Sequence, residues 1–429
     1  MVKKSFIFSF CILMISFMET KAQDDTRQLM QIDSSLTYIN GEGTFLSLGK
    51  ADGTRLNLLT TLQTGVQYNR LDSAAGIRTS NRMSLNLARI SLSATSYKNR
   101  LSVVIVSDLI GQTPILEGWV GFTFMNKSAK IILGQKQTNT NNRLAMADER
   151  YSQLLGQSIS GKSDDGIVYG ALMKNFVGAT REGGIFLETN FGYKKFKVYP
   201  SFSITTGEGQ NFFNAQPNVG FKYGGRLDLL PFGDFIKNNA FIAHDIYNEK
   251  TPKFAIGFAA SLNVKASSSI GSENATISGI YNSSGLPDYA NYRKLVADMV
   301  FKYKGFALIG EFINGSITGK DLFTNTLSSS KFTENIASAS YNLGSAYNIQ
   351  TSYIFKNHWA IDGRFSTIIP EIESASSIVQ NQNWYSLGVN KFIKNNAVKI
   401  GLNTTYINNS SLSVPTKKWI GNIAIQILM

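Results

Sequence analysis

Arginine and lysine residues recur on the polar side of segments in which polar and apolar residues alternate. An arginine side chain presents a planar fork that matches the oxygens of phosphate or carboxylate, and a lysine presents a point charge. If these polar sides face one water-filled space, their basic residues concentrate anions in it. The sequence therefore predicts a set of pore-lining, anion-binding residues, which are Arg89, Lys136, Lys222, Arg226, Lys253, Lys302, Arg364 and Lys399. Three further basic residues on such faces are Arg55, Lys265 and Lys294.

Acidic residues share these polar faces, so the basic residues have a second interpretation. The acids are Glu117, Asp228, Asp298, Glu311 and Asp362. Opposite charges on neighbouring strands stabilise a sheet, and a ladder of such pairs would stiffen it without binding a solute. The sequence leaves both interpretations open.

The long polar segment 139–182 is a candidate for a constriction of the same space. It follows the fifth predicted strand and carries charges of both signs, among them Arg143, Asp148, Glu149 and Arg150. We expect this loop to fold into the space that the strands enclose and to narrow it. The alternative is a loop exposed on the surface.

Residues suited to catalysis or metal binding are scarce. The chain has two histidines, His244 and His358, in unrelated segments, and its one cysteine, Cys11, lies close to the N-terminus. A serine hydrolase needs a histidine beside a serine and an orienting group, and thiolate metal sites need several cysteines. The sequence therefore predicts no enzyme activity, no cofactor and no metal site.

The first residues predict secretion. Lys3 and Lys4 precede an apolar run, 5–18, which is followed by Thr20-Lys21-Ala22. A charged region, an apolar region and a small-residue cleavage site in this order are typical of a secretory signal peptide. We therefore expect a signal peptide at 1–22, an N-terminal periplasmic segment at 23–53, which is polar and irregular over 23–45, and a single domain at 54–429.

Alternation with a period of two continues through that domain and predicts an all-β fold. In Lys253–Lys265, for example, Phe254, Ile256 and Phe258 share one face. Such strands exceed the typical ~5–6 residues of soluble sheets and suit the ~9–11 residues of a tilted membrane-spanning strand. Short turns rich in lysine and asparagine alternate with long polar loops, as in transmembrane β-barrels.

About sixteen antiparallel strands are predicted. Their ranges are 54–70, 81–97, 100–109, 115–125, 129–138, 183–193, 196–206, 218–230, 252–266, 292–303, 306–314, 345–356, 358–369, 383–393, 397–408 and 417–429. An even number places both ends of the chain on the periplasmic side. Ala240–Ile246, within the unusually long join 231–251, and Gly166–Leu172 could add two strands, so eighteen is the alternative.

Several segments resemble the phosphate-selective porin O and P family. Leu87–Ser93 is similar to that family's arginine-bearing second strand, Ile132–Lys136 to its Gly-Gln-x-Lys strand, and 148–150 to a Glu-Arg in its third loop. Other similar segments are 116–122, 206–209, 225–233, 363–366 and 387–392. Two positions depart from the pattern, since Arg89 stands alone where several arginines are expected and Thr138-Asn139 replaces a proline.

The resemblance implies a sixteen-stranded, homotrimeric porin in the outer membrane of a Gram-negative bacterium, in contact with its lipid and lipopolysaccharide. It also implies a passive channel for small anions such as phosphate, and no nucleic-acid partner. The formal net charge of +13 agrees with anion preference, although lysines in the short turns supply part of it. The alternative is a barrel whose outer loops act in adhesion or surface assembly, with little conductance.

Overall fold

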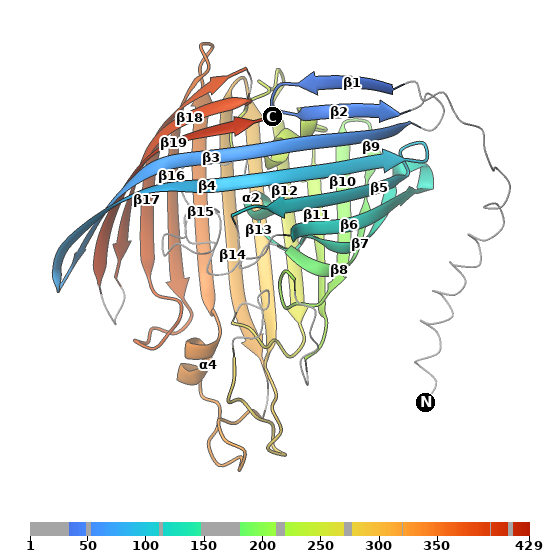
Figure 1. Cartoon of the computed structure of the whole chain (residues 1–429). Helices are drawn as coiled ribbons and strands as arrows, with labels where there is room; N and C mark the ends of the chain where they lie inside the picture. Colours follow the sequence, from blue (N-terminus) through green and yellow to red (C-terminus); the bar gives the residue numbers. More distant parts are fainter. Residues whose placement is uncertain are drawn as a thin grey trace, which may run out of the picture.

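The protein forms a closed antiparallel β-barrel (Figure 1). The computed structural model describes residues 34–48, 53–110, 115–146, 181–211, 219–269, 277–319, 321–394, 396–410 and 415–429. Sixteen strands make the wall, and each pairs with the next along the chain. The last, β19 (Thr416–Leu428), pairs with the first, β3 (Thr54–Ser73), and this pairing closes the barrel. The predicted fold class and strand number are confirmed.

The strands between these two follow the predicted ranges closely. They are β4 (Gly76–Ser96), β5 (Leu101–Asp108), β6 (Ile115–Phe124), β7 (Ala129–Gln137), β8 (Arg181–Thr189), β9 (Phe191–Tyr193), β10 (Phe196–Thr205), β11 (Lys222–Leu230), β12 (Lys253–Asn263), β13 (Asn291–Tyr303), β14 (Phe306–Thr318), β15 (Gly344–Ile354), β16 (Trp359–Pro370), β17 (Gln382–Ile393) and β18 (Val398–Asn409). β8 and β9 both pair with β10 and form one wall strand, interrupted at Asn190.

The alternative of eighteen strands is wrong. Instead of a strand at Ala240–Ile246, the structure has a 3-10 helix, η4 (Ile236–Phe241), followed by a bend. The other extra candidate, Gly166–Leu172, lies outside the described residues.

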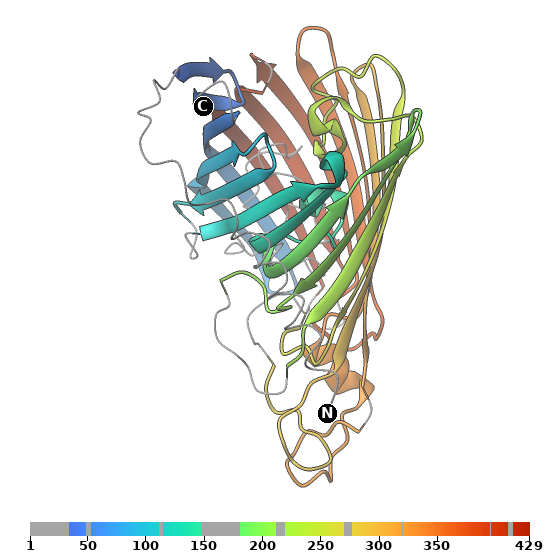
Figure 2. The ribbon, with the colours of Figure 1, turned by 90° about the vertical axis from the view of Figure 1, so that its right-hand side faces the viewer.

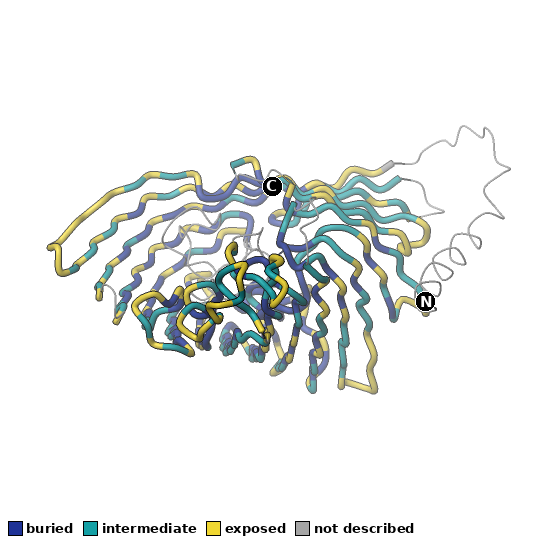
Figure 3. Tube along the Cα trace, turned by 90° about the horizontal axis from the view of Figure 1, so that it is seen from below, coloured by how far each residue is buried: buried dark blue, intermediate teal, exposed yellow. Residues whose placement is uncertain are grey.

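Burial alternates along the wall strands with the period of two that the sequence predicts (Figure 3). On the outer face, large apolar side chains are exposed, for example Leu295, Leu387 and Ile423. A barrel leaves no strand edge unpaired and can therefore place this face in lipid. Among the described residues, no helix combines the length and the apolar content that a membrane crossing needs.

A hairpin precedes the barrel. It consists of β1 (Ser34–Ile39) and β2 (Gly43–Leu48), although the sequence predicts an irregular segment here. β2 pairs with residues 54–58 of β3, whereas β19 pairs only with residues 61–73 of the same strand. The hairpin thus covers the part of the β3 edge that the C-terminal strand is too short to reach.

The two ends of the barrel differ in their connections (Figures 1 and 2). One end, the short-turn end, has connections such as Lys194-Lys195, Lys304-Gly305 and the 3-10 turn η1 (Met125–Lys127). Lys304 and Gly305 both have positive φ, of 46° and 87°, as the tight turns of twisted hairpins require. At the other end, long loops and helix α4 (Glu334–Ser340) form an extension with its own apolar core.

Candidate channel constriction

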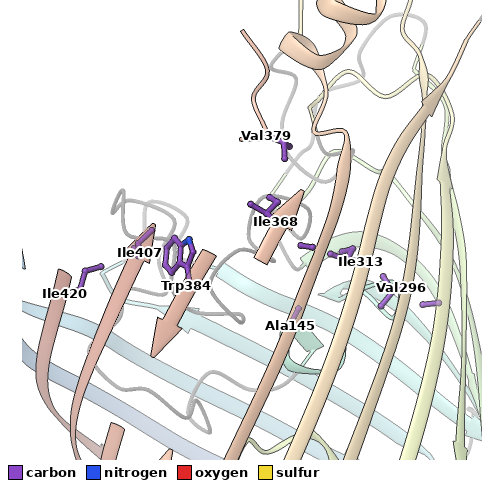
Figure 4. Close-up of a cluster of buried hydrophobic side chains, with 10 residues drawn as sticks. Ala145, Val296, Ile313, Ile368, Val379, Trp384, Ile407 and Ile420 are labelled. Atoms are coloured by element: carbon purple, nitrogen blue, oxygen red, sulfur yellow. The ribbon is translucent and has the colours of Figure 1, made fainter. Parts of the chain in front are cut away.

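The loop after β7 turns into the barrel. Its described part, Thr138–Met146, contains the short helix α2 (Arg143–Met146), and we call it the α2 loop. Its residues from Thr138 to Arg143 are all buried. Ala145 belongs to a cluster of apolar side chains from the wall strands that includes Val296 and Ile313 (Figure 4). The predicted constriction residue Arg143 therefore lies inside the barrel, while Asp148, Glu149 and Arg150 lie outside the described residues.

Arg143 belongs to a buried cluster of four charged side chains. Its Nε atom donates to Asp298 Oδ1 at 3.0 Å, and its guanidinium also pairs with Asp228. Arg226 bridges the same carboxylates, with Nε 2.7 Å from Asp228 Oδ2 and Nη2 2.8 Å from Asp298 Oδ1. Gly257 lies between the two aspartates in the strand register, and a Cβ atom there would come within 2.0 Å of Arg226 Nη2. The glycine therefore leaves the space that the cluster occupies.

The α2 loop is also fixed through its backbone and its asparagines. Arg143 N donates to Asp298 Oδ2 at 3.0 Å, and Leu144 N donates to Glu311 Oε1 at 2.9 Å. Lys294 Nζ donates to Asn141 Oδ1 at 2.7 Å. Because Lys294, Asp298 and Glu311 belong to β13 and β14, these contacts attach the loop to one side of the wall.

The connection between β11 and β12, Pro231–Pro252, also folds into the barrel, from the short-turn end. We call it the mouth segment. Phe235 and Ala240 pack in a buried cluster with Val300 and Ile309 of the wall. His244 Nε2 lies 2.7 Å from Asp362 Oδ1 on β16, so the segment reaches a distant part of the wall. Burial lowers the pKa of His244, and the nearby Asp362 carboxylate opposes this shift.

The two inward connections meet. The Arg143 guanidinium lies 5.2 Å from the centre of the Phe241 ring, and Leu144 packs on the same apolar cluster as that ring. Beside them is a cavity of about 750 Å³, lined by the wall, the α2 loop and the mouth segment. Its lining mixes charged and aromatic side chains, including Trp119, Lys136, Arg143, Glu188, Tyr199 and Asp234. A second cavity of about 330 Å³ shares Glu117 and Gln137 with the first.

Three predicted pore-lining residues form ion pairs with acids of other wall strands. Lys136 pairs with Glu188, Lys222 Nζ lies 2.6 Å from Glu182 Oε1, and Arg89 Nε lies 3.8 Å from Asp108 Oδ2. Arg226 belongs to the four-charge cluster described above. Sequence reasoning missed the acidic partners Asp108, Glu182 and Glu188, although the period of two along their strands places each on the polar side.

The other predicted residues are held in different ways. Lys302 is fully buried and donates to backbone carbonyl oxygens of the mouth segment. Lys253 Nζ donates to the Phe232 carbonyl oxygen at 3.1 Å. Arg364 is buried near Glu311, and the ammonium of the buried Lys399 lies 5.4 Å from the centre of the Phe392 ring. Lys136 and Arg226 are the two of the eight that line the larger cavity.

Comparison with solved structures agrees with this architecture. An anion-selective porin from Comamonas acidovorans matches with a TM-score of 0.54 at 12% identity, over 88% of this chain and 100% of that one. The outer-membrane channel DcaP of Acinetobacter baumannii matches with a TM-score of 0.52 at 9% identity, over 89% of this chain and 99% of that one. The protein is an outer-membrane β-barrel. At these identities the likeness gives the fold, which is that of the bacterial outer-membrane porins, and the apolar outer face is the one that such barrels present to lipid.

No protein-family model matches the chain, and no curated protein matches it either. Membership of the phosphate-selective porin O and P family therefore stays a prediction.

Proposed function

We propose that this protein is a passive diffusion channel for small polar solutes. The observation that carries the proposal is the cavity of about 750 Å³ inside the barrel, beside the two inward connections. Polar and charged side chains line it, which suits water and hydrated solutes. The narrowing by the α2 loop and the mouth segment supports selection by size.

For selectivity, we propose a preference for small anions such as phosphate. It is supported by the formal net charge of +13 and by the arginines and lysines on the inner faces of the strands. Because Lys136 and Arg226 are already paired with carboxylates, an anion meets a reduced field. We therefore expect a modest preference that weakens as salt screens these charges.

We propose that the channel works without catalysis, as a homotrimer in contact with outer-membrane lipid and lipopolysaccharide. In support of a non-catalytic role, His244 is buried with Asp362 as its hydrogen-bond partner, and His358 lies in a short turn. The trimer rests on the resemblance stated from the sequence. Mobility of unheated protein on a denaturing gel tests it.

A second candidate function is adhesion or surface assembly through the loop extension at the other end of the barrel. The observation that favours it is a buried cluster that packs Tyr292, Tyr341 and Ile280 beneath helix α4, so these loops have an ordered core. Leu286 and Leu327 are exposed on the extension.

Planar-bilayer recording of the purified protein tests the proposed function and separates the two candidates. A diffusion channel gives stepwise conductance, and in a salt gradient its reversal potential reports anion preference. A folded barrel that inserts without conductance contradicts the channel and favours the surface function.

A further inference from the structure

The mouth segment, Pro231–Pro252, is unlike the other described connections at the short-turn end. Those between Tyr193 and Phe196 and between Tyr303 and Phe306 consist of two residues each. Two residues are enough to join antiparallel neighbours. The additional length therefore has no role in connecting β11 to β12, and the structure places it inside the barrel.

The mouth segment is a compact unit with satisfied polar groups. Asp245 accepts hydrogen bonds from Asn239 Nδ2 at 2.8 Å and from the Glu249 backbone amide at 3.1 Å. Glu249 Oε1 accepts from the Ile236 amide at 2.8 Å and from Asn239 Nδ2 at 3.1 Å. Asn239, Asp245 and Glu249 are all at most 1% exposed. Buried and mutually bonded polar groups favour one defined conformation.

Lys302 of β13 binds this unit from the wall. Its ammonium donates to the carbonyl oxygens of Asn239, Ile242 and His244, each at 2.6 Å, and to Asn239 Oδ1 at 3.0 Å. These acceptors lie at the end of η4 and in the bend that follows it, so a single side chain fixes this bend. Hydrogen bonds to a charged donor are among the stronger ones in proteins.

Two other contacts hold the mouth segment at separate points of the wall. The adjacent β13–β14 turn donates through Gly305 N to Asp245 Oδ2 at 2.8 Å and through Lys304 N to the Glu249 carbonyl oxygen at 2.9 Å. His244 bonds to Asp362 of β16, and Asn390 of β17 donates to the same carboxylate. The mouth segment is therefore attached to the wall at β13, at the β13–β14 turn and at β16.

One face of β13 fixes both inward connections. Lys294, Asp298 and Lys302 are spaced by four residues, so all three point to the same side of the strand. Lys294 and Asp298 hold the α2 loop, and Lys302 holds the mouth segment. The same strand thus sets the relative positions of the two connections that border the larger cavity.

We propose that the mouth segment is a second, built-in constriction of the channel and that Lys302 is the residue that positions it. The inference rests on the proposed channel function and assigns part of its size selection to the short-turn end. Asp234, Phe235 and Lys237 of the mouth segment line the cavity together with Lys136, Glu188 and Tyr199 of the wall. A solute in the cavity therefore touches this segment as well as the α2 loop.

The test compares single-channel conductance and the size cut-off for neutral sugars in liposome swelling among three variants. In the first, an Asn-Gly turn replaces Gly233–Pro252. The second is Lys302→Met, which removes the ammonium donor but keeps a long side chain. Lys304→Met is the control, because it removes the same charge from the neighbouring turn, where the Lys304 side chain stacks on Tyr303.

We expect the turn replacement to raise conductance and admit larger sugars, and Lys302→Met to give higher or noisier conductance than Lys304→Met. If Lys302→Met fails to fold, the turn replacement decides alone. A conducting wild type whose turn replacement has the same conductance and cut-off would overturn the inference and leave the channel function standing. A wild-type protein without conductance overturns the channel function. If the turn replacement then conducts, the mouth segment closes the barrel, which supports its role as a constriction. If neither protein conducts, the constriction is overturned together with the channel function.

Discussion

Replacing Asp298 by alanine should open the constriction and strengthen anion preference. This buried carboxylate accepts hydrogen bonds from Arg143 N and Arg143 Nε, both at 3.0 Å, and from Arg226 Nη2 at 2.8 Å. Without it, Asp228 alone faces two guanidinium groups, and the cluster changes from neutral to a net charge of +1.

The size of the effect follows from the burial of the cluster. Removing one partner from a buried ion pair costs about 3–5 kcal/mol. β13 is held by its pairing with β12 and β14. We therefore expect the repulsion between the two guanidinium groups to be relieved by movement of Arg143, which detaches the α2 loop. A change of about 3 kcal/mol shifts the equilibrium between the attached and detached loop by roughly 150-fold, so a well-attached loop becomes a predominantly detached one.

The assay is single-channel recording with a salt gradient, at low and at high salt. Asp298→Ala should give higher conductance and a reversal potential displaced toward anions, with the larger displacement at low salt. Asp288→Ala is the matched control, because it removes the same charge from the Lys265–Asp288 pair, in which 43% of the lysine side chain is exposed. If Asp298→Ala and Asp288→Ala give the same conductance and reversal potential, the cluster does not control the pore.

Three further predictions follow from the described contacts. Lys136→Glu places a second carboxylate beside Glu188 at the cavity and should displace the reversal potential toward cations, whereas an unchanged potential would assign Lys136 to a structural ladder. Deleting residues 143–150 should raise conductance with the barrel intact; equal conductance would place the constriction elsewhere. Lowering the pH from 7 to 5 should loosen the mouth segment, because burial lowers the pKa of His244, which faces Asp362, Lys302 and Lys399. Below about pH 6.5 the His244 imidazole binds a proton in the unfolded segment but not in the folded one, which favours the unfolded segment. Cleavage of the segment by added protease should therefore increase at pH 5 in the wild type but not in His244→Gln.

The barrel itself could be predicted from the sequence because its determinants are local. Alternation with a period of two places every second side chain in lipid, and this pattern identifies strands such as 253–263 without reference to their neighbours. The β1–β2 hairpin could not be predicted in this way, because its place on the barrel is not determined locally. Its strands have six residues each, and their pairing depends on an edge that β19 leaves uncovered.

The chemistry of the candidate site could be predicted only in part. The polar side of a strand follows from alternation, but the partner of each charge depends on register across several strands. Arg226 reaches Asp298, which lies two strands away with Gly257 between, and no local pattern relates these positions. The mouth segment likewise owes its place to Lys302, about sixty residues later in the chain.

The direct test of the channel function is the behaviour of the purified wild-type protein in planar bilayers, with folding verified by the heat-dependent gel mobility of a barrel and insertion by co-flotation with liposomes. We expect discrete conductance steps and, in a salt gradient, a modest anion preference that weakens as salt increases. Verified insertion without conductance steps would contradict the channel function.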